Sequence, residues 1–229
     1  CYCLAGRAAP RGLLDGSVME RLDFVLPEWT RVIWVSGVAR SVWERRIRAF
    51  AAAWAEAEWR SVVLGVRDAA LIHVAADRLD DVARQVGEHR LVLMPIAKTN
   101  LPNNSYASSS QPYDPARPLA YRVLVARPSV VTDYWQTGGD DAVLGRLLGY
   151  PDCCVRFFRR VWVEERYLDT TWPMYEASGR DASGPVEANI LLRWVGVRLV
   201  PHLPCSFRCA ATVELGRSMA EVLGRLGYE

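Results

Sequence analysis

The chain has 229 residues, of which 51% are hydrophobic and 24% are charged, and its formal net charge at pH 7 is +2. This length and composition are typical of a globular protein with one large domain or two small ones. The small net charge gives no indication of nucleic acid or an anionic membrane as a partner, and no apolar run approaches the roughly 20 residues that span a bilayer. No signal peptide is recognised, so we expect a cytoplasmic protein.

The first half of the chain alternates between strand and helix patterns. Trp43, Ile47, Phe50 and Trp54 recur on one face of a predicted helix over 41–59. The other predicted elements of this half are strands at 31–37, 61–66, 69–75, 89–97 and 119–126 and a helix at 77–88. This alternation predicts a small α/β or α+β sheet.

A long segment rich in Pro, Asn and Ser, residues 98–118, separates the last two of these strands. Loops of this length are either functional lids or surface segments without a role. The only lysine of the chain, Lys98, opens this loop at the end of a predicted strand, which is where functional groups of sheet proteins often lie. We therefore consider Lys98 as a candidate catalytic residue, with an ordinary surface lysine as the alternative.

The second half has the pattern of a helical protein. Helices are predicted at 140–149, 151–168, 185–197 and 209–227. The predicted fold class is therefore α+β, with a small sheet part over 1–128 followed by a helical, cysteine-rich and metal-binding part over 129–229. The two parts could also form one integrated domain.

The six cysteines are unevenly distributed. Four of them lie in two short stretches, GYPDCCVRFF (149–158) and PHLPCSFRCAAT (201–212), and the other two are Cys1 and Cys3. Clustered cysteines in a chain that is neither small nor visibly secreted indicate metal binding or catalysis rather than a disulfide framework. The two N-terminal cysteines could complete such a site.

Both stretches place a proline just before cysteines. Proline is favoured at the first position of a helix, so Pro151 and Pro204 predict two helix starts. Cys153 and Cys154 then fall in the first turn of one helix, and Cys205 and Cys209 lie one turn apart on the other. The free N–H groups of a helix start stabilise thiolates, which are the ligands of zinc and of iron–sulfur clusters. Because adjacent side chains point about 100° apart on a helix, we expect only one of Cys153 and Cys154 to ligate.

Three further residues are candidates near this site. His202 precedes Cys205 by three residues, and it could be a fourth ligand or an acid–base group, or it could hydrogen-bond a loop carbonyl. Asn189 and Arg193 are one turn apart on the predicted helix 185–197 and could line the cysteine site as cofactor-binding groups.

The two stretches resemble a group of uncharacterised prokaryotic proteins that carry a GYPxCC element and an HxPCSxxC element. The resemblance covers residues 145–215. It implies that Cys153, Cys154, His202, Cys205 and Cys209 act as one unit, and it implies no particular reaction.

Three functional hypotheses follow from these residues. The first is a metalloenzyme whose [4Fe–4S] cluster, held by the cysteines, carries out Lewis-acid or sulfur-handling chemistry on a small-molecule substrate, with His202 as acid or base. The second is a zinc protein with the same ligands, in which a closed four-ligand site is structural and an open one catalytic. The third is a thiol redox or binding protein without a metal.

Overall fold

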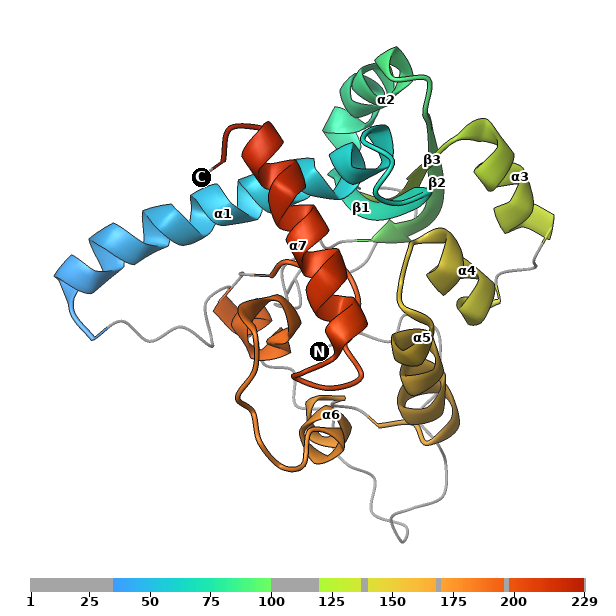
Figure 1. Cartoon of the computed structure of the whole chain (residues 1–229). Coiled ribbons are helices and arrows are strands. Elements are labelled where there is room, and N and C mark those ends of the chain that lie inside the picture. Colours follow the sequence, from blue (N-terminus) through green and yellow to red (C-terminus); the bar gives the residue numbers. More distant parts are fainter. Residues whose placement is uncertain (1–34, 100–119, 137–139, 168–169, 196–197, 229) are drawn as a thin grey trace, which may run out of the picture.

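The computed structural model describes residues 35–99, 120–136, 140–167, 170–195 and 198–228. The N-terminal elements are α1 (Gly37–Val63), β1 (Ala69–Ala75), the 3-10 turn η1 (Ala76–Arg78), α2 (Leu79–Glu88), β2 (Val92–Thr99) and β3 (Ala120–Ala126). The following elements are α3 (Pro128–Gln136), α4 (Asp141–Leu147), α5 (Asp152–Phe158), the π-helical turn η2 (Arg159–Glu164), α6 (Thr171–Ala177), the 3-10 turns η3 (Val186–Ala188) and η4 (Ile190–Val195), and α7 (Ala210–Arg225). A small sheet and many helices make this an α+β protein, which confirms the predicted fold class (Figure 1).

The sheet is a three-stranded antiparallel sheet in the order β1-β3-β2. Because the side chains of a strand alternate between its two faces, Val123 and Val125 of the central strand β3 point to one side, and Leu124 and Ala126 to the other. The first pair packs with residues of α1 and α2, and the second with residues of α3 and α4. The sheet is therefore the middle of three layers, and the first cysteine pair follows α4 directly.

Helix α1 is longer than the sequence pattern predicts. Ser36 caps its start by accepting a hydrogen bond from the backbone N–H of Ala39 at 3.0 Å. The predicted strand 61–66 is wrong, because residues 61–63 continue the helix and Gly65 ends it at a φ of +73°. Of the predicted strand 31–37, residues 35–36 form a bend and Gly37 begins α1, while 31–34 lie outside the described residues.

The C-terminal helices pack in two further groups. Helix α7 crosses the C-terminal half of α1 (Figure 1). At this crossing, Met219, Val222 and Leu223 pack against Ala53, Trp54 and Ala57. Phe157, Val161, Met174, Ile190 and Phe207 form the core of the region around α5 and α6. The predicted helix 185–197 is replaced by the two short turns η3 and η4. The domain boundary at residue 128 stays a prediction.

Candidate metal centre

The first two cysteines lie where the sequence predicts them. The chain leaves α4 through Gly149, whose φ of +71° is a left-handed conformation that favours glycine. Pro151 then forms the N-cap of α5, and Cys153 and Cys154 occupy the first turn of that helix. Their backbone N–H groups are at the positive end of the helix dipole, which stabilises negative charge on sulfur.

The second cysteine pair is placed differently from the prediction. Helix α7 begins at Ala210, with Cys209 as its N-cap, so Cys205 lies in the bend before the helix and not in its first turn. A turn closed by a hydrogen bond from the Cys209 N–H to the Ser206 carbonyl at 3.3 Å stops the helix from starting earlier. The Phe207 side chain, 1% exposed, anchors this turn in the core.

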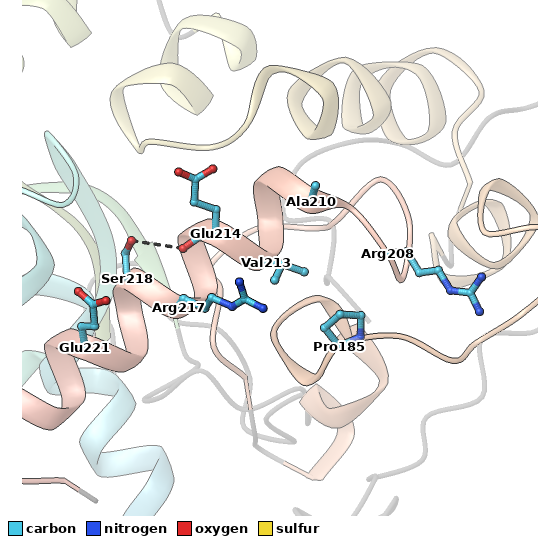
Figure 2. Close-up of a pocket in the computed structure, with 8 residues that line it drawn as sticks. All are labelled: Pro185, Arg208, Ala210, Val213, Glu214, Arg217, Ser218 and Glu221. Atoms are coloured by element: carbon cyan, nitrogen blue, oxygen red, sulfur yellow. Dashed lines mark hydrogen bonds between the residues drawn. The ribbon is translucent and has the colours of Figure 1, made fainter.

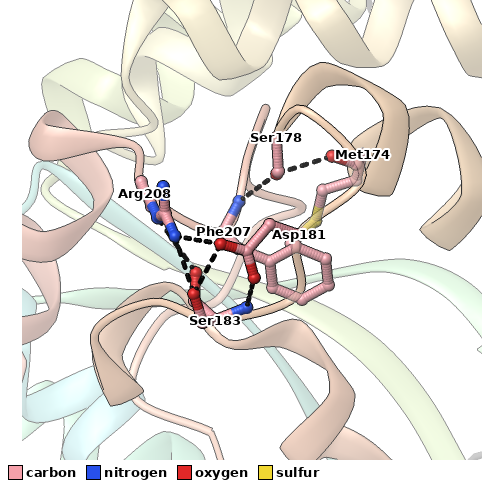
Figure 3. A network of polar contacts seen from close by, with 6 residues as sticks. All are labelled: Met174, Ser178, Asp181, Ser183, Phe207 and Arg208. Carbon is pink, nitrogen blue, oxygen red and sulfur yellow. Dashed lines mark hydrogen bonds and ion pairs between the residues drawn. The ribbon is translucent and has the colours of Figure 1, made fainter.

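The turn that carries Cys205 and Cys209 is fastened to the segment after α6. The Phe207 N–H donates to the Ser178 hydroxyl at 2.8 Å, and the Arg208 guanidinium pairs with Asp181 and donates to the Ser183 hydroxyl at 2.7 Å (Figure 3). These contacts hold the turn on both sides of Phe207. The spacing of the two sulfurs is thus fixed by polar contacts as well as by apolar packing.

All four cysteine sulfurs meet at one point. The Sγ atoms of Cys153, Cys154, Cys205 and Cys209 lie within 4.8 Å of one another, and all four are free thiols. Cys209 Sγ is 3.7 Å from Cys153 Sγ and 3.7 Å from Cys154 Sγ, and the adjacent pair is separated by 3.9 Å. This group can hold a metal.

Both sulfurs of the adjacent pair belong to this group, and the expectation that only one of Cys153 and Cys154 ligates a metal stays a prediction. On the flank of a helix, neighbouring side chains diverge by about 100°. In the first turn, however, every Cα–Cβ bond tilts toward the N-terminus, where the chain before the helix leaves room. Cys153 and Cys154 can therefore converge on one point from the first turn.

The thiols share hydrogen bonds, which separates their pKa values. Hydrogen bonds from Cys154 and then from Cys205 lower the pKa of Cys209 far below its ordinary value. The pKa of Cys154 is raised by its hydrogen bonds with Cys205 and Cys209 and by burial. For Cys205, the hydrogen bond with Cys154 lowers the pKa, but the bond with Cys209 and burial outweigh it and raise the pKa to about 12. One thiolate is thus favoured at the expense of its neighbours, and a bound cation would offset their mutual repulsion.

His202 contacts the cysteine group through an intermediate residue. Its Nε2 lies 3.0 Å from the Thr212 hydroxyl, and that hydroxyl lies 3.3 Å from Cys154 Sγ. Burial lowers the pKa of His202 to about 4, with the Cys209 thiolate acting against this shift and the Arg67 guanidinium adding to it. His202 is therefore a neutral, buried neighbour of the four-cysteine group, and its role as acid or base stays a prediction.

The remaining predicted site residues either belong to other elements or lie outside the described residues. Lys98 lies within β2, opposite Tyr121 of β3, and is exposed. Asn189 ends the turn η3, where its side chain accepts a hydrogen bond from the backbone N–H of Leu191 at 3.1 Å. The backbone of Arg193 is part of η4, but its side chain lies outside the described residues, as do Cys1 and Cys3. Their functional roles stay predictions.

An open groove of about 570 Å³ runs along α7 beside the site (Figure 2). Its lining residues are Pro185, Arg208, Ala210, Val213, Glu214, Arg217, Ser218 and Glu221, and none of the four cysteines is among them. The lining carries charges of both signs, from two arginines and two glutamates. One of these arginines, Arg217, also pairs with Glu187 at 3.5 Å. Nothing about this groove points to a particular ligand.

Sequence reasoning missed three residues that surround the site: Arg67, Tyr150 and Thr212. Tyr150 packs against His202 with ring centroids 5.2 Å apart, and Arg67 is buried at 4% exposure. Tyr150 carries a signal that could have been used, since it lies inside the GYPDCC stretch. Arg67, about 80 residues before that stretch, carries none.

None of the described helices combines the length and the apolar character that a membrane crossing requires. No family model matches the sequence, and no curated protein or solved structure is detectably similar to it.

Proposed function

We propose that this protein binds a single tetrahedral metal ion, zinc, through Cys153, Cys154, Cys205 and Cys209, and that the ion links α5 to the start of α7. The observation that carries the proposal is the spacing of the four sulfur atoms. Thiolates are the preferred protein ligands of structural zinc.

The spacing agrees with one ion rather than with a cluster of ions. Zinc–sulfur bonds of about 2.3 Å in a tetrahedron separate the sulfurs by about 3.8 Å. The sulfur pairs of Cys153, Cys154 and Cys209 are 3.7, 3.7 and 3.9 Å apart. A [4Fe–4S] cube is itself several ångströms wide, so its cysteine sulfurs are about 6 Å apart. The iron–sulfur enzyme is therefore the less well supported alternative, because its ligands would have to move apart.

An ion held by four thiolates has no open position for a substrate, so the proposed role is structural. Cys205 and Cys209 lie about 50 residues after the other two ligands, and each pair belongs to a different element. Because such a site exists only in the folded chain, the free energy of metal binding adds to the stability of the fold. Any reaction on a small molecule would then be carried out by neighbouring residues and not at the ion.

The test is metal and sulfide analysis with X-ray absorption spectroscopy, on protein purified without oxygen. We expect one zinc per chain, four sulfur neighbours at about 2.3 Å and no metal–metal scattering. Cys205→Ala should lose most of the metal, while Ser206→Ala, a change of similar size next to it, should retain it.

Other results would contradict the proposal in distinct ways. Iron with acid-labile sulfide would favour the cluster alternative. A metal-free protein that folds normally and responds only to reductant would leave the thiol redox hypothesis.

A further inference from the structure

A buried arginine with an unused hydrogen-bond donor lies near the metal centre. Arg67 follows the C-terminus of α1, and its side chain turns back onto that helix. Its Nε donates to the Ser61 hydroxyl at 2.8 Å and its Nη2 to the Glu58 carbonyl at 2.5 Å. Its Nη1 is buried and has no partner among the residues that the structure describes. A charged donor left unsatisfied in a protein core is costly, which suggests that a ligand is absent.

The GYP part of the first cysteine stretch connects Arg67 to His202. A Cβ atom on Gly149 would lie 3.0 Å from Arg67 Cγ, so the arginine packs directly on the glycine backbone. The next residue, Tyr150, packs its ring on that of His202 at 5.2 Å. Gly149 and Tyr150 thus each contact one of these two side chains.

His202 also has a buried atom, Nδ1, with no hydrogen-bond partner in the described part of the chain. If the proposed function holds and Cys154 is a thiolate, its sulfur can only accept a hydrogen bond. The Thr212 hydroxyl then donates to that sulfur at 3.3 Å and accepts from the His202 Nε2–H at 3.0 Å. A neutral imidazole with its proton on Nε2 has an unprotonated Nδ1, which is a hydrogen-bond acceptor without a donor.

The charges nearby favour an anion as the absent ligand. The Glu58 carboxylate, whose charge acts on Arg67, pairs with Arg198 at 3.7 Å, so this one buried carboxylate lies near two guanidinium groups. Arg198 also lies over the ring of Trp54, whose buried Nε1 is a further donor without a partner in the described part of the chain. Charge-assisted hydrogen bonds to an anionic oxygen are about twice as strong as those between neutral groups.

We propose that Arg67 and His202 bind a small oxyanion that still carries a proton, such as hydrogen phosphate or hydrogen carbonate, in the core next to the metal centre. An anionic oxygen of the ligand accepts from Arg67 Nη1, and its O–H group donates to His202 Nδ1. A halide ion would satisfy the arginine and leave the histidine without a donor.

The test is calorimetric titration of the metal-loaded protein with inorganic phosphate and, separately, with hydrogen carbonate, against chloride at equal ionic strength. We expect at least one of the two oxyanions, but not chloride, to bind with one site per chain. Arg67→Lys keeps the positive charge but removes Nη1, and His202→Gln keeps a donor to Thr212 but removes Nδ1. Each should weaken binding at least about tenfold. Arg84→Lys, at a side chain that is 69% exposed, is the matched control and should change nothing.

Metal content is measured first on every variant, so that failure of the metal site can be distinguished from failure of the oxyanion site. Loss of metal in His202→Gln would be read from the metal analysis, and the oxyanion site would then be judged on Arg67→Lys alone. Binding of neither oxyanion, or equal binding by both variants with full metal content, would overturn the proposal. A crystal structure of the phosphate-soaked, metal-loaded protein with only a water molecule between Arg67 Nη1 and His202 Nδ1 would overturn it as well.

Discussion

Replacing Thr212 with valine tests the link between the cysteine group and the histidine behind it. Valine has nearly the shape of threonine, so the change removes one hydroxyl from a fully buried position and leaves the packing intact. Cys154 Sγ loses its 3.3 Å contact, and His202 Nε2 loses its 3.0 Å hydrogen bond. A buried group left unsatisfied costs about 1–3 kcal/mol, so we expect the free energy of unfolding to fall by about that amount. Loss of a hydrogen bond to a ligand should also weaken metal affinity about 10–100-fold.

Two measurements check this prediction: urea unfolding of the metal-loaded protein and competition with a chromophoric chelator. Thr132→Val is the matched control, because the Thr132 hydroxyl makes a 3.3 Å bond to the Pro128 carbonyl at an exposed position. That control should change stability by less than about 0.5 kcal/mol. If Thr212→Val unfolds and releases metal as the wild-type protein does, the hydrogen-bond chain has no energetic role and the reasoning is refuted.

Two more predictions concern acid and the cysteine turn. The pKa of His202, lowered by burial from 6.5 to about 4, means that the folded protein disfavours its protonation; stability is therefore complete above pH 6.5 and falls between pH 6.5 and 4, by roughly 3 kcal/mol. His202→Gln should remove this part of the pH dependence of urea unfolding, and an unchanged slope would contradict the assignment. In Gly184→Ala, the new Cβ would lie 2.1 Å from the Phe207 carbonyl oxygen, so the turn must shift and chelator competition should show weaker metal binding. Gly87→Ala, where a Cβ meets nothing within 4 Å on a helix, should stabilise the protein by up to about 1 kcal/mol, and equal effects of the two changes would count against a role for the turn.

The sheet and the long helices could be predicted from local pattern. The apolar runs of β1 and β3 are properties of single segments, and both strands appear where the sequence indicates them. The predicted apolar face of α1 is only partly buried, because Trp54 lies in the core while Trp43 is 52% exposed. The predicted strand 61–66 failed because a short apolar run is compatible with a strand or a buried helix end. Val62, 1% exposed, is buried as the strand would require, but on the last turn of α1.

The cysteine site was predictable in composition but not in geometry. The two cysteine stretches identified all four sulfurs, because clustered thiols near helix starts are uncommon without a role. The proline signal gave α5 correctly, yet it misplaced the start of α7, since the bonds that hold the turn before Ala210 come from Ser178 and Asp181, nearly 30 residues earlier. Arg67 could not be found at all, because its burial depends on tertiary contacts.

The packing of α7 on α1 also constrains the order of events during synthesis. Trp54 and its neighbours on α1 leave the ribosome before their partners on α7, from Met219 to Leu223, which emerge more than 160 residues later. Two of the four thiols, Cys205 and Cys209, arrive only just before α7. Until nearly all of the described elements have been made, the apolar residues of α1 therefore lack their partners on α7, and only two of the four thiols are present. Burial of α1 and completion of the four-thiol group then belong to the same late interval.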